Sequence, residues 1–226
     1  MNTLTKMALG LLGQLKPEPP QGDAADTIAL PAANTSGGMS LMQALARRQS
    51  QREFAPEPLP LPVLSNLLWA AAGLNRPALG GRTTPSAMNA QEVDVYVALP
   101  AGLYRYAALG HALHLVRATD VRRVTGYQDF VDSAPLDLIM VADFSRMKLV
   151  PLAQRMAYAY TCAGAMAQNV YLYCAAEDLA TVIRAWLDRD ALAKAMGLGT
   201  EQQVLLSQTV GRKAPYPLLP ASAADK

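Results

Sequence analysis

Three arginines lie within six residues in the segment ARRQSQREF, residues 46–54. Guanidinium groups make planar, charge-assisted contacts with phosphates and carboxylates, so a cluster of this kind is typical of a site that holds an anion. In the alternative interpretation, Arg47, Arg48 and Arg52 only place positive charge at the C-terminal end of a helix, which is worth under about 1 kcal/mol. The cluster by itself leaves both interpretations open.

A second polar segment, PSAMNAQ at residues 85–91, leads into the apolar run EVDVYVAL. The side-chain amide of Asn89 combines donors with an acceptor and suits a ligand edge that presents both. The alternative is an ordinary turn in which Ser86 or Asn89 caps the local backbone. This segment by itself does not decide between a ligand-binding loop and a turn.

Other familiar reaction centres are missing from the sequence, which has no Gly-x-Gly-x-x-Gly, no Walker loop and no Gly-x-Ser-x-Gly. Its two histidines, His111 and His114, stand three apart in an expected strand, where their side chains face opposite ways. We therefore expect neither a metal site nor Ser–His or Cys–His catalysis. Cys162 and Cys174 match no zinc or redox spacing and are expected to be buried, inert thiols. An enzyme without these groups takes its chemistry from a cofactor.

Composition limits the classes of partner. The chain has 226 residues, 51% of them apolar, which fits a single domain with a full core. A net charge of +2 and 6% aromatic residues provide no basic, aromatic-rich surface for nucleic acid. No run approaches the roughly twenty apolar residues of a membrane span, and residues 1–15 predict a frayed helix rather than a signal peptide. We therefore expect a cytoplasmic protein that binds neither nucleic acid nor membrane.

The helices and strands that must position the polar segments are predicted from hydrophobic periodicity and from turn and capping residues. Residues 16–38 contain four prolines and three glycines, so residues 1–38 are expected to form an extended arm or linker and residues 39–226 the folded domain. Helical spacing and caps predict helices over residues 41–48, 62–72, 151–175 and 188–198. Strands are predicted over residues 92–99, 103–106, 113–116, 136–144, 179–186 and 203–211, with residues 73–91 as a loop. This order predicts an α+β fold around a mixed sheet.

Three of these elements carry more specific expectations. Leu41, Met42 and Leu45 give the first helix one apolar face. The strand over residues 92–99 alternates valines with other residues and is expected to be half-buried. The helix over residues 151–175 is apolar nearly all round, which predicts burial at the domain centre or against another subunit.

Together, the two polar segments resemble a known family. RRQSQREF is similar to the R-R/H-S-x-R/K-x-F segment of flavin-dependent nitroreductases, and PSAMNAQ to their P-S-x-x-N-x-Q loop. The later order is also similar: a long apolar helix, an extended segment, a short helix ending in Gly-Leu, and a strand ending in Val-Gly-Arg. The resemblance covers roughly residues 40–213. It implies a mainly antiparallel sheet flanked by helices in an intertwined homodimer that holds two FMN molecules at the subunit interface.

The resemblance also implies roles for individual residues. Arg48 and Ser50 match the positions for the FMN phosphate and ribityl chain, while Arg47 points elsewhere. Arg52 matches a basic residue that faces the flavin pyrimidine oxygen and stabilises the reduced form. Arg212, with Lys213, matches a basic group at the C-terminal end. The complete set implied to bind cofactor is Arg48, Gln49, Ser50, Arg52, Pro85, Ser86, Ala87, Met88, Asn89, Gln91, Ile183, Arg184, Ala185, Gly211 and Arg212.

The segment VIRAW departs from the family pattern. This chain has Ile183, Ala185 and Trp186 in a region where nitroreductases often have Pro and then Glu-Gly. The family uses backbone amides here, so the contact does not depend on the missing side chains, although the departure bears on substrate choice. Trp186 is expected to be either a wall of the pocket or a core residue.

The activity implied by the resemblance is hydride transfer from NAD(P)H through bound FMN to a small nitroaromatic or quinone-like acceptor. No catalytic side chain is implied, because protons can come from water. Two flavin-based alternatives are a dehydrogenase of azoline rings in modified peptides and a flavin-binding or storage protein without turnover. A structural domain that binds no flavin is the remaining alternative.

Overall fold

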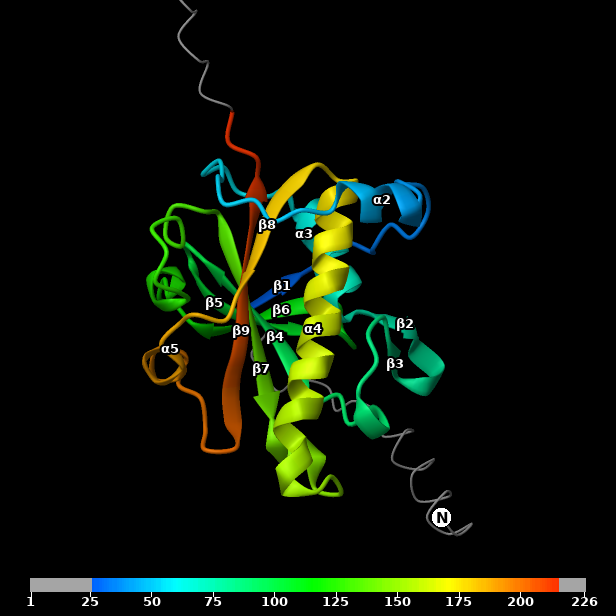
Figure 1. Cartoon of the computed structure of the whole chain (residues 1–226), viewed down its shortest axis with the longest axis vertical. Coiled ribbons are helices and arrows are strands. Elements are labelled where there is room, and N and C mark those ends of the chain that lie inside the picture. Colours follow the sequence, from blue (N-terminus) through cyan, green and yellow to red (C-terminus); the bar gives the residue numbers. More distant parts are fainter. Residues whose placement is uncertain (1–25, 216–226) are drawn as a thin grey trace, which may run out of the picture.

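The computed structural model describes residues 26–215, which fold around one seven-stranded sheet (Figure 1). Its strands are β1 (Thr27–Ala29), β4 (Val93–Leu99), β5 (Gly102–Ala107), β6 (Ala112–Arg117), β7 (Leu136–Asp143), β8 (Leu179–Arg184) and β9 (Gln202–Arg212). They are ordered β1-β6-β5-β4-β7-β9-β8, and every neighbouring pair is antiparallel. The predicted α+β class and mainly antiparallel sheet are therefore confirmed, and β7 is the interior strand that its apolar sequence indicates.

The helices are α2 (Leu41–Arg47), α3 (Leu61–Ala72), α4 (Leu152–Ala176) and α5 (Arg189–Met196). The long helix α4 crosses one face of the sheet and α5 lies apart from it, at the left of Figure 1. Alternate residues of β7 contribute to two separate cores, because successive side chains of a strand face opposite ways. Leu138 belongs to the core under α3 and α4, whereas Ile139 belongs to the smaller core under α5.

Caps mark the ends of these helices, which lie within two residues of the predicted ends. Ser40 caps α2 with a complete capping box, in which its hydroxyl accepts from the Gln43 backbone N–H. Pro62 lies in the first turn of α3, where a missing N–H costs nothing. Asp188 caps α5, and Gly197 ends it in the left-handed conformation at φ 72°. Local sequence thus fixes the boundaries of three helices around the two polar segments.

The strand expected to be half-buried is buried on both faces. The alternation in β4 places Asp94 and Tyr96 opposite the valines, yet both are covered. The Asp94 carboxylate forms an ion pair with Arg146, 2.5 Å between Oδ2 and Nη2, and Tyr96 packs in the core under α5. The prediction was wrong because a paired charge can be buried and a second layer covers this face.

Two segments expected to lack packed elements contain short strands. In the loop over residues 73–91, β2 (Leu74–Arg76) and β3 (Gly81–Arg82) form a small two-stranded sheet. In the N-terminal arm, β1 adds to the edge of the main sheet beside β6, and Leu30 is buried. Edge pairing of three residues carries almost no sequence signal, which explains the difference. The helix expected over residues 1–15 lies outside the described residues.

Both histidines fasten this N-terminal edge strand. His111 lies in the turn before β6 at φ 44°, not in a strand as expected. The buried Ser65 hydroxyl donates to the Pro31 carbonyl at 2.5 Å, so its oxygen accepts from His111 Nε2 at 2.6 Å. His111 Nδ1 then accepts from the Tyr106 hydroxyl at 2.8 Å. Burial lowers the pKa of the His111 imidazole, which favours the neutral ring that this chain of hydrogen bonds accommodates.

The hydrogen bonds around His111 predict that the free energy of unfolding depends on pH. Because the folded state favours neutral His111, its contribution is complete above the ordinary pKa of 6.5 and is lost as the pH falls below it. His111→Asn keeps a residue that tolerates positive φ but removes the titration. We expect it to lower the free energy of unfolding by about 1–2 kcal/mol at pH 7.5 and to flatten the decline between pH 7.5 and 5.5. Urea unfolding at both pH values checks this; parallel declines in wild type and variant would contradict it.

Two helices expose apolar faces in the single chain. Leu41, Met42 and Leu45 of α2 are 62%, 74% and 43% exposed, so the predicted apolar face is present but uncovered. Helix α4 was expected to have no wet face, yet it buries only one side and exposes Ala157, Thr161 and Gly164 on the opposite one. In the described part of the chain, no helix is long and apolar enough to cross a membrane. The single chain therefore leaves two neighbouring helix faces without an apolar partner.

Candidate functional site

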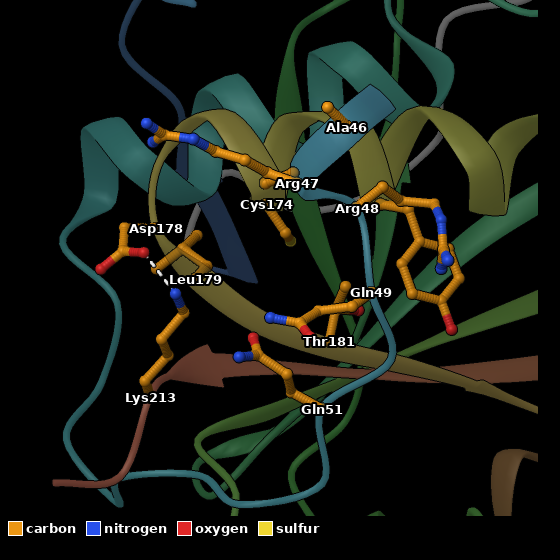
Figure 2. Close-up of a pocket in the computed structure, with 12 residues that line it drawn as sticks. Ala46, Arg47, Arg48, Gln49, Gln51, Cys174, Asp178, Leu179, Thr181 and Lys213 are labelled. Atoms are coloured by element: carbon orange, nitrogen blue, oxygen red, sulfur yellow. Dashed lines mark hydrogen bonds and ion pairs between the residues drawn. The ribbon is translucent and has the colours of Figure 1, made fainter. Parts of the chain in front are cut away.

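A cleft of about 440 Å³ lies between the end of α2, the last turns of α4 and the start of β8 (Figure 2). The arginine-rich segment predicted to hold an anion forms one wall. The lining residues are Ala46, Arg47, Arg48, Gln49, Gln51, Tyr171, Cys174, Ala175, Asp178, Leu179, Thr181 and Lys213. The anion site predicted from ARRQSQREF thus coincides with a real concavity.

Backbone hydrogen bonds bring three of the predicted segments together at this cleft. The segment after α2 runs beside the free edge of β8, where the Gln51 N–H donates to the Thr181 carbonyl at 3.0 Å. It then reaches the end of β9, where the Ala55 N–H donates to the Arg212 carbonyl at 3.0 Å. Residues far apart in sequence, 48–52, 179–185 and 211–213, therefore lie side by side, as the predicted cofactor site requires.

Positive charge surrounds the cleft. Arg48 is half-buried at the C-terminal end of α2, and Lys213 pairs with Asp178 at the rim. Figure 2 shows Arg47 and Arg48 extending away from each other on opposite sides of the cleft. The expectation that Arg47 points elsewhere needs correction, because Arg47 also borders the cleft. These cations fit a phosphate-bearing ligand.

Other predicted ligands lie nearby but are exposed. Ser50, Arg52 and Arg212 are all exposed. Among residues 26–215, the guanidinium groups of Arg52 and Arg212 take part in no ion pair. Exposed arginines can move to a ligand with little desolvation cost. Their position therefore permits the predicted roles without fixing them.

Tyr171 is a site residue that the sequence reading missed. Its ring lies under the Arg48 guanidinium at 5.2 Å from the ring centroid. Its hydroxyl is 2.8 Å from Ser50 Oγ and accepts from the Ile183 N–H at 3.0 Å. A tyrosine inside an apolar helix gives no sequence signal of such a role, because its spacing is that of an ordinary core residue.

The Arg184 side chain does not reach the cleft. It is buried on the other side of β8, where Nη2 pairs with Asp137 Oδ1 at 2.5 Å and donates to Thr125 and Thr209 hydroxyls at 3.2 and 2.8 Å. Burial lowers the pKa of Arg184 and raises that of Asp137 to about 6. As a cofactor ligand, Arg184 is therefore limited to its backbone.

Two residues on the free edge of β8 already make backbone contacts. Because N–H groups alternate along an antiparallel strand, Thr181 and Ile183 face the edge, where their groups meet Gln51 and Tyr171. The Ile183 amide is therefore occupied. Ala185 is the first residue beyond β8 and is exposed.

Trp186 is not a core residue. Its side chain is 70% exposed, and its ring lies 5.2 Å from that of Tyr127, which is 55% exposed. It does not line the cleft of the single chain. The interpretation as a core residue is wrong, and a role as a wall of the complete site stays a prediction.

The PSAMNAQ loop has an unusual backbone. Met88, Asn89 and Gln91 have φ values of 56°, 52° and 49°. Left-handed backbone costs about 1–3 kcal/mol for a non-glycine residue and persists where the surroundings hold it, often at functional sites. Ser86 Oγ accepts from the Gln91 N–H at 3.0 Å, so the local capping of the alternative interpretation is present. Capping alone does not explain three such residues in one loop.

Hydrogen bonds from Gln91 and to Gln91 hold the end of this loop in place. Gln91 donates its side-chain amide to the Gly80 carbonyl at 2.6 Å, and its own carbonyl accepts from Arg146 at 2.8 Å. The next residue, Glu92, is fully buried, and neither carboxyl oxygen has a hydrogen-bond partner within the described range. Burial raises the pKa of Glu92. Gln91 thus acts as an anchor of the loop in this chain.

PSAMNAQ does not join the cleft in a single chain. None of residues 85–91 lines it. Glu92, which ends the loop, is close enough to Cys162 to influence its thiol, whereas the cleft is bordered by Tyr171, nine residues further along α4. Nine helical residues span about 13 Å. The segments ARRQSQREF and PSAMNAQ therefore lie beside different parts of α4.

The remaining reactive groups are inert or scattered. Cys162 and Cys174 are free and buried, as predicted, and burial raises the pKa of Cys162 to about 12 and that of Cys174 further. Within residues 26–215, no three His, Cys, Asp or Glu side chains are grouped to hold a metal ion. The cleft therefore offers cations, amides and hydroxyls for binding but no nucleophile–base pair.

Comparison with known proteins supports one family. The model of the nitroreductase family matches residues 45–212. A protein of Methanocaldococcus jannaschii that bears the name nitroreductase is 30% identical over 186 residues, covering 77% of this chain and 92% of the relative.

Solved structures agree with this match. A crystal structure from Ralstonia eutropha, also named a nitroreductase, has a TM-score of 0.82 and 51% identity, covering 89% of this chain and 96% of that one. The NADPH:FMN oxidoreductase of Vibrio harveyi, solved with NAD⁺, has a TM-score of 0.59 and 18% identity, covering 82% and 76%. At that identity, the second likeness concerns the fold alone.

Proposed function

Because this chain belongs to the nitroreductase family and is an oxidoreductase, we propose that it uses FMN to pass hydride from NAD(P)H to a nitroaromatic or quinone-like acceptor. The observation that carries the proposal is that Arg48 and Lys213 meet the free edge of β8 at one cleft, with Ser50 beside it in contact with Tyr171. A phosphate-bearing, partly polar and partly flat ligand matches this combination of cations, hydroxyls and edge amides.

Each group of the cleft has a role in this proposal. Arg48 and Lys213 hold the phosphate, and Ser50 contacts the ribityl chain. Arg52 lies at the pyrimidine edge, where a cation stabilises the charge of the reduced ring. The Ala185 amide is the donor that β8 adds to the isoalloxazine edge. Bound FMN supplies the hydride chemistry, and the protein supplies orientation and electrostatic tuning.

The complete site requires a second copy of the chain in this proposal. Asn89 and its neighbours have the proposed role of contacting the ligand, yet they do not line the cleft of their own chain. The exposed apolar residues of α2 and the uncovered side of α4 provide a surface for a homodimer in which each loop serves the partner's cleft. Light scattering should then show a dimer at micromolar concentration, whereas a stable FMN-loaded monomer would remove this part of the proposal.

Anaerobic stopped-flow mixing tests the proposed reaction. Protein loaded with FMN is mixed with NADH or NADPH, and the visible absorbance of the oxidised flavin is followed. The proposal expects rapid bleaching, followed by recovery when a quinone or nitroaromatic is added. A storage protein would bind FMN without useful bleaching. Recovery with an azoline-containing peptide but not with small acceptors would favour the peptide dehydrogenase.

A further inference from the structure

Tyr171 lines the cleft and connects the segment after α2 with strand β8. Its ring supports the Arg48 guanidinium at 5.2 Å, its hydroxyl lies 2.8 Å from Ser50 Oγ, and it accepts from the Ile183 N–H at 3.0 Å. The side chain is 6% exposed and belongs to α4, the longest helix of the described chain. The long helix therefore contacts the segment after α2 through one side chain.

The hydroxyl contacts constrain Ser50 whichever oxygen donates. The Ile183 N–H occupies one acceptor position of Tyr171 Oη. If Tyr171 donates to Ser50, the serine proton is free for a ligand; if Ser50 donates, its lone pairs are free. Both arrangements hold the otherwise exposed serine in one orientation.

The ring contact acts separately on Arg48. A guanidinium stacked over an aromatic face loses rotamer freedom before a ligand arrives, which reduces the cost of binding. Arg48 has no ion-pair partner among residues 26–215, so the ring is its main support.

We propose that Tyr171 is a positioning residue for the phosphate and ribityl end of the cofactor: its ring presets Arg48 and its hydroxyl presets Ser50. This inference rests on the proposed function. The two parts of the side chain then have separable effects. Loss of the ring should reduce affinity for the phosphate, whereas loss of the hydroxyl should affect the ribityl contact that FMN shares with riboflavin.

The test measures dissociation constants for FMN and for riboflavin, which lacks the phosphate, in matched variants. Tyr171→Leu should raise the dissociation constant for FMN by about three- to thirtyfold and that for riboflavin by less, so that the preference for FMN falls. Tyr171→Phe keeps the ring and should weaken both ligands together, by about two- to tenfold, with the preference unchanged.

Tyr173→Phe is the control. It lies two residues further along α4, and its hydroxyl donates to the Val63 carbonyl at 3.2 Å, away from the cleft. Loss of that bond should lower the unfolding midpoint but leave both dissociation constants unchanged. The preference ratio distinguishes positioning from general destabilisation, because a loss of folded protein affects both ligands equally.

The outcomes are separable from those of the proposed function. If wild type binds FMN but Tyr171→Leu keeps the full preference for FMN, the ring does not preset Arg48 and the inference fails while the proposed function stands. If Tyr171→Leu does not fold, Tyr171→Phe decides: unchanged affinity for both ligands would overturn the inference. If wild type binds neither flavin, the proposed function and this inference both fail.

Discussion

Asp137→Ala is expected to lower the free energy of unfolding by about 3–5 kcal/mol, because it leaves a buried charge without its partner. Asp137 is fully buried, and it receives hydrogen bonds from Arg184, Thr125 and Thr209. The alanine variant strands the Arg184 guanidinium between β8 and the loop before β7. Urea unfolding followed by circular dichroism measures the loss.

An exposed ion pair provides the matched control for this prediction. Arg123 Nη1 lies 2.5 Å from Asp132 Oδ2, but the two side chains are 74% and 40% exposed. Arg123→Ala should change the unfolding free energy by less than about 1 kcal/mol. In the double variant Asp137→Leu with Arg184→Met, the loss should be smaller than the sum of the single losses. A loss below about 1 kcal/mol for Asp137→Ala would show that Arg184 finds water or another partner.

Arg48→Ala is expected to weaken FMN binding by roughly ten- to a hundredfold, since a charge-assisted contact is worth about 1.5–3 kcal/mol. Arg47→Ala is its neighbouring control. Arg47 also borders the cleft, but it extends away from Arg48 and is exposed (Figure 2). It should therefore weaken FMN by less than about threefold, as expected for a solvated cation. Fluorescence titration of FMN measures both.

Arg52→Ala separates binding from redox tuning in the same series. It should weaken FMN less than Arg48→Ala but lower the two-electron potential by tens of millivolts, because about 30 mV corresponds to 1.4 kcal/mol. Equal, small effects on affinity in all three variants would mean that the arginines only solvate a helix end. A large loss confined to Arg47→Ala would mean that the motif has been aligned one residue out of register.

The elements that could be predicted are those with strong local signals. The capping residue Ser40, the Asp188 and Gly197 caps of α5 and the valine alternation of β4 each depend on chemistry within a few residues. The motif segments could also be located, because their residue types and order are specific. Local physics and motif order together were sufficient for the fold class and for one wall of the cleft.

What could not be predicted depends on contacts between distant segments. The pair of Asp137 with Arg184 joins residues 47 apart, and the contact of Ser50 with Tyr171 joins residues 121 apart. The sequence around Arg184 does not show which side of β8 its side chain faces, and the sequence of α4 does not show that Tyr171 borders the cleft. Arg184 was therefore counted as a ligand while Tyr171 was overlooked. Burial of Asp94 has the same cause, since its partner Arg146 lies 52 residues away.

Helix exposure shows a different limit. The apolar composition of α4 indicates burial, but the single chain buries only one of its sides. Leu41, Met42 and Leu45 of α2 are likewise apolar and exposed. An apolar pattern predicts that a helix face will be buried, but it does not show whether the same chain or another one covers that face.

The visible absorption spectrum of the purified protein, combined with a titration of FMN into protein freed of cofactor, tests the central claim most directly. We expect a yellow protein that rebinds one FMN per chain. At an FMN concentration that keeps the Arg47→Ala variant saturated, the Arg48→Ala variant should be largely free of FMN. A colourless protein that binds no FMN, or one that binds it unaffected by Arg48→Ala, would contradict the assignment of this cleft as the flavin site.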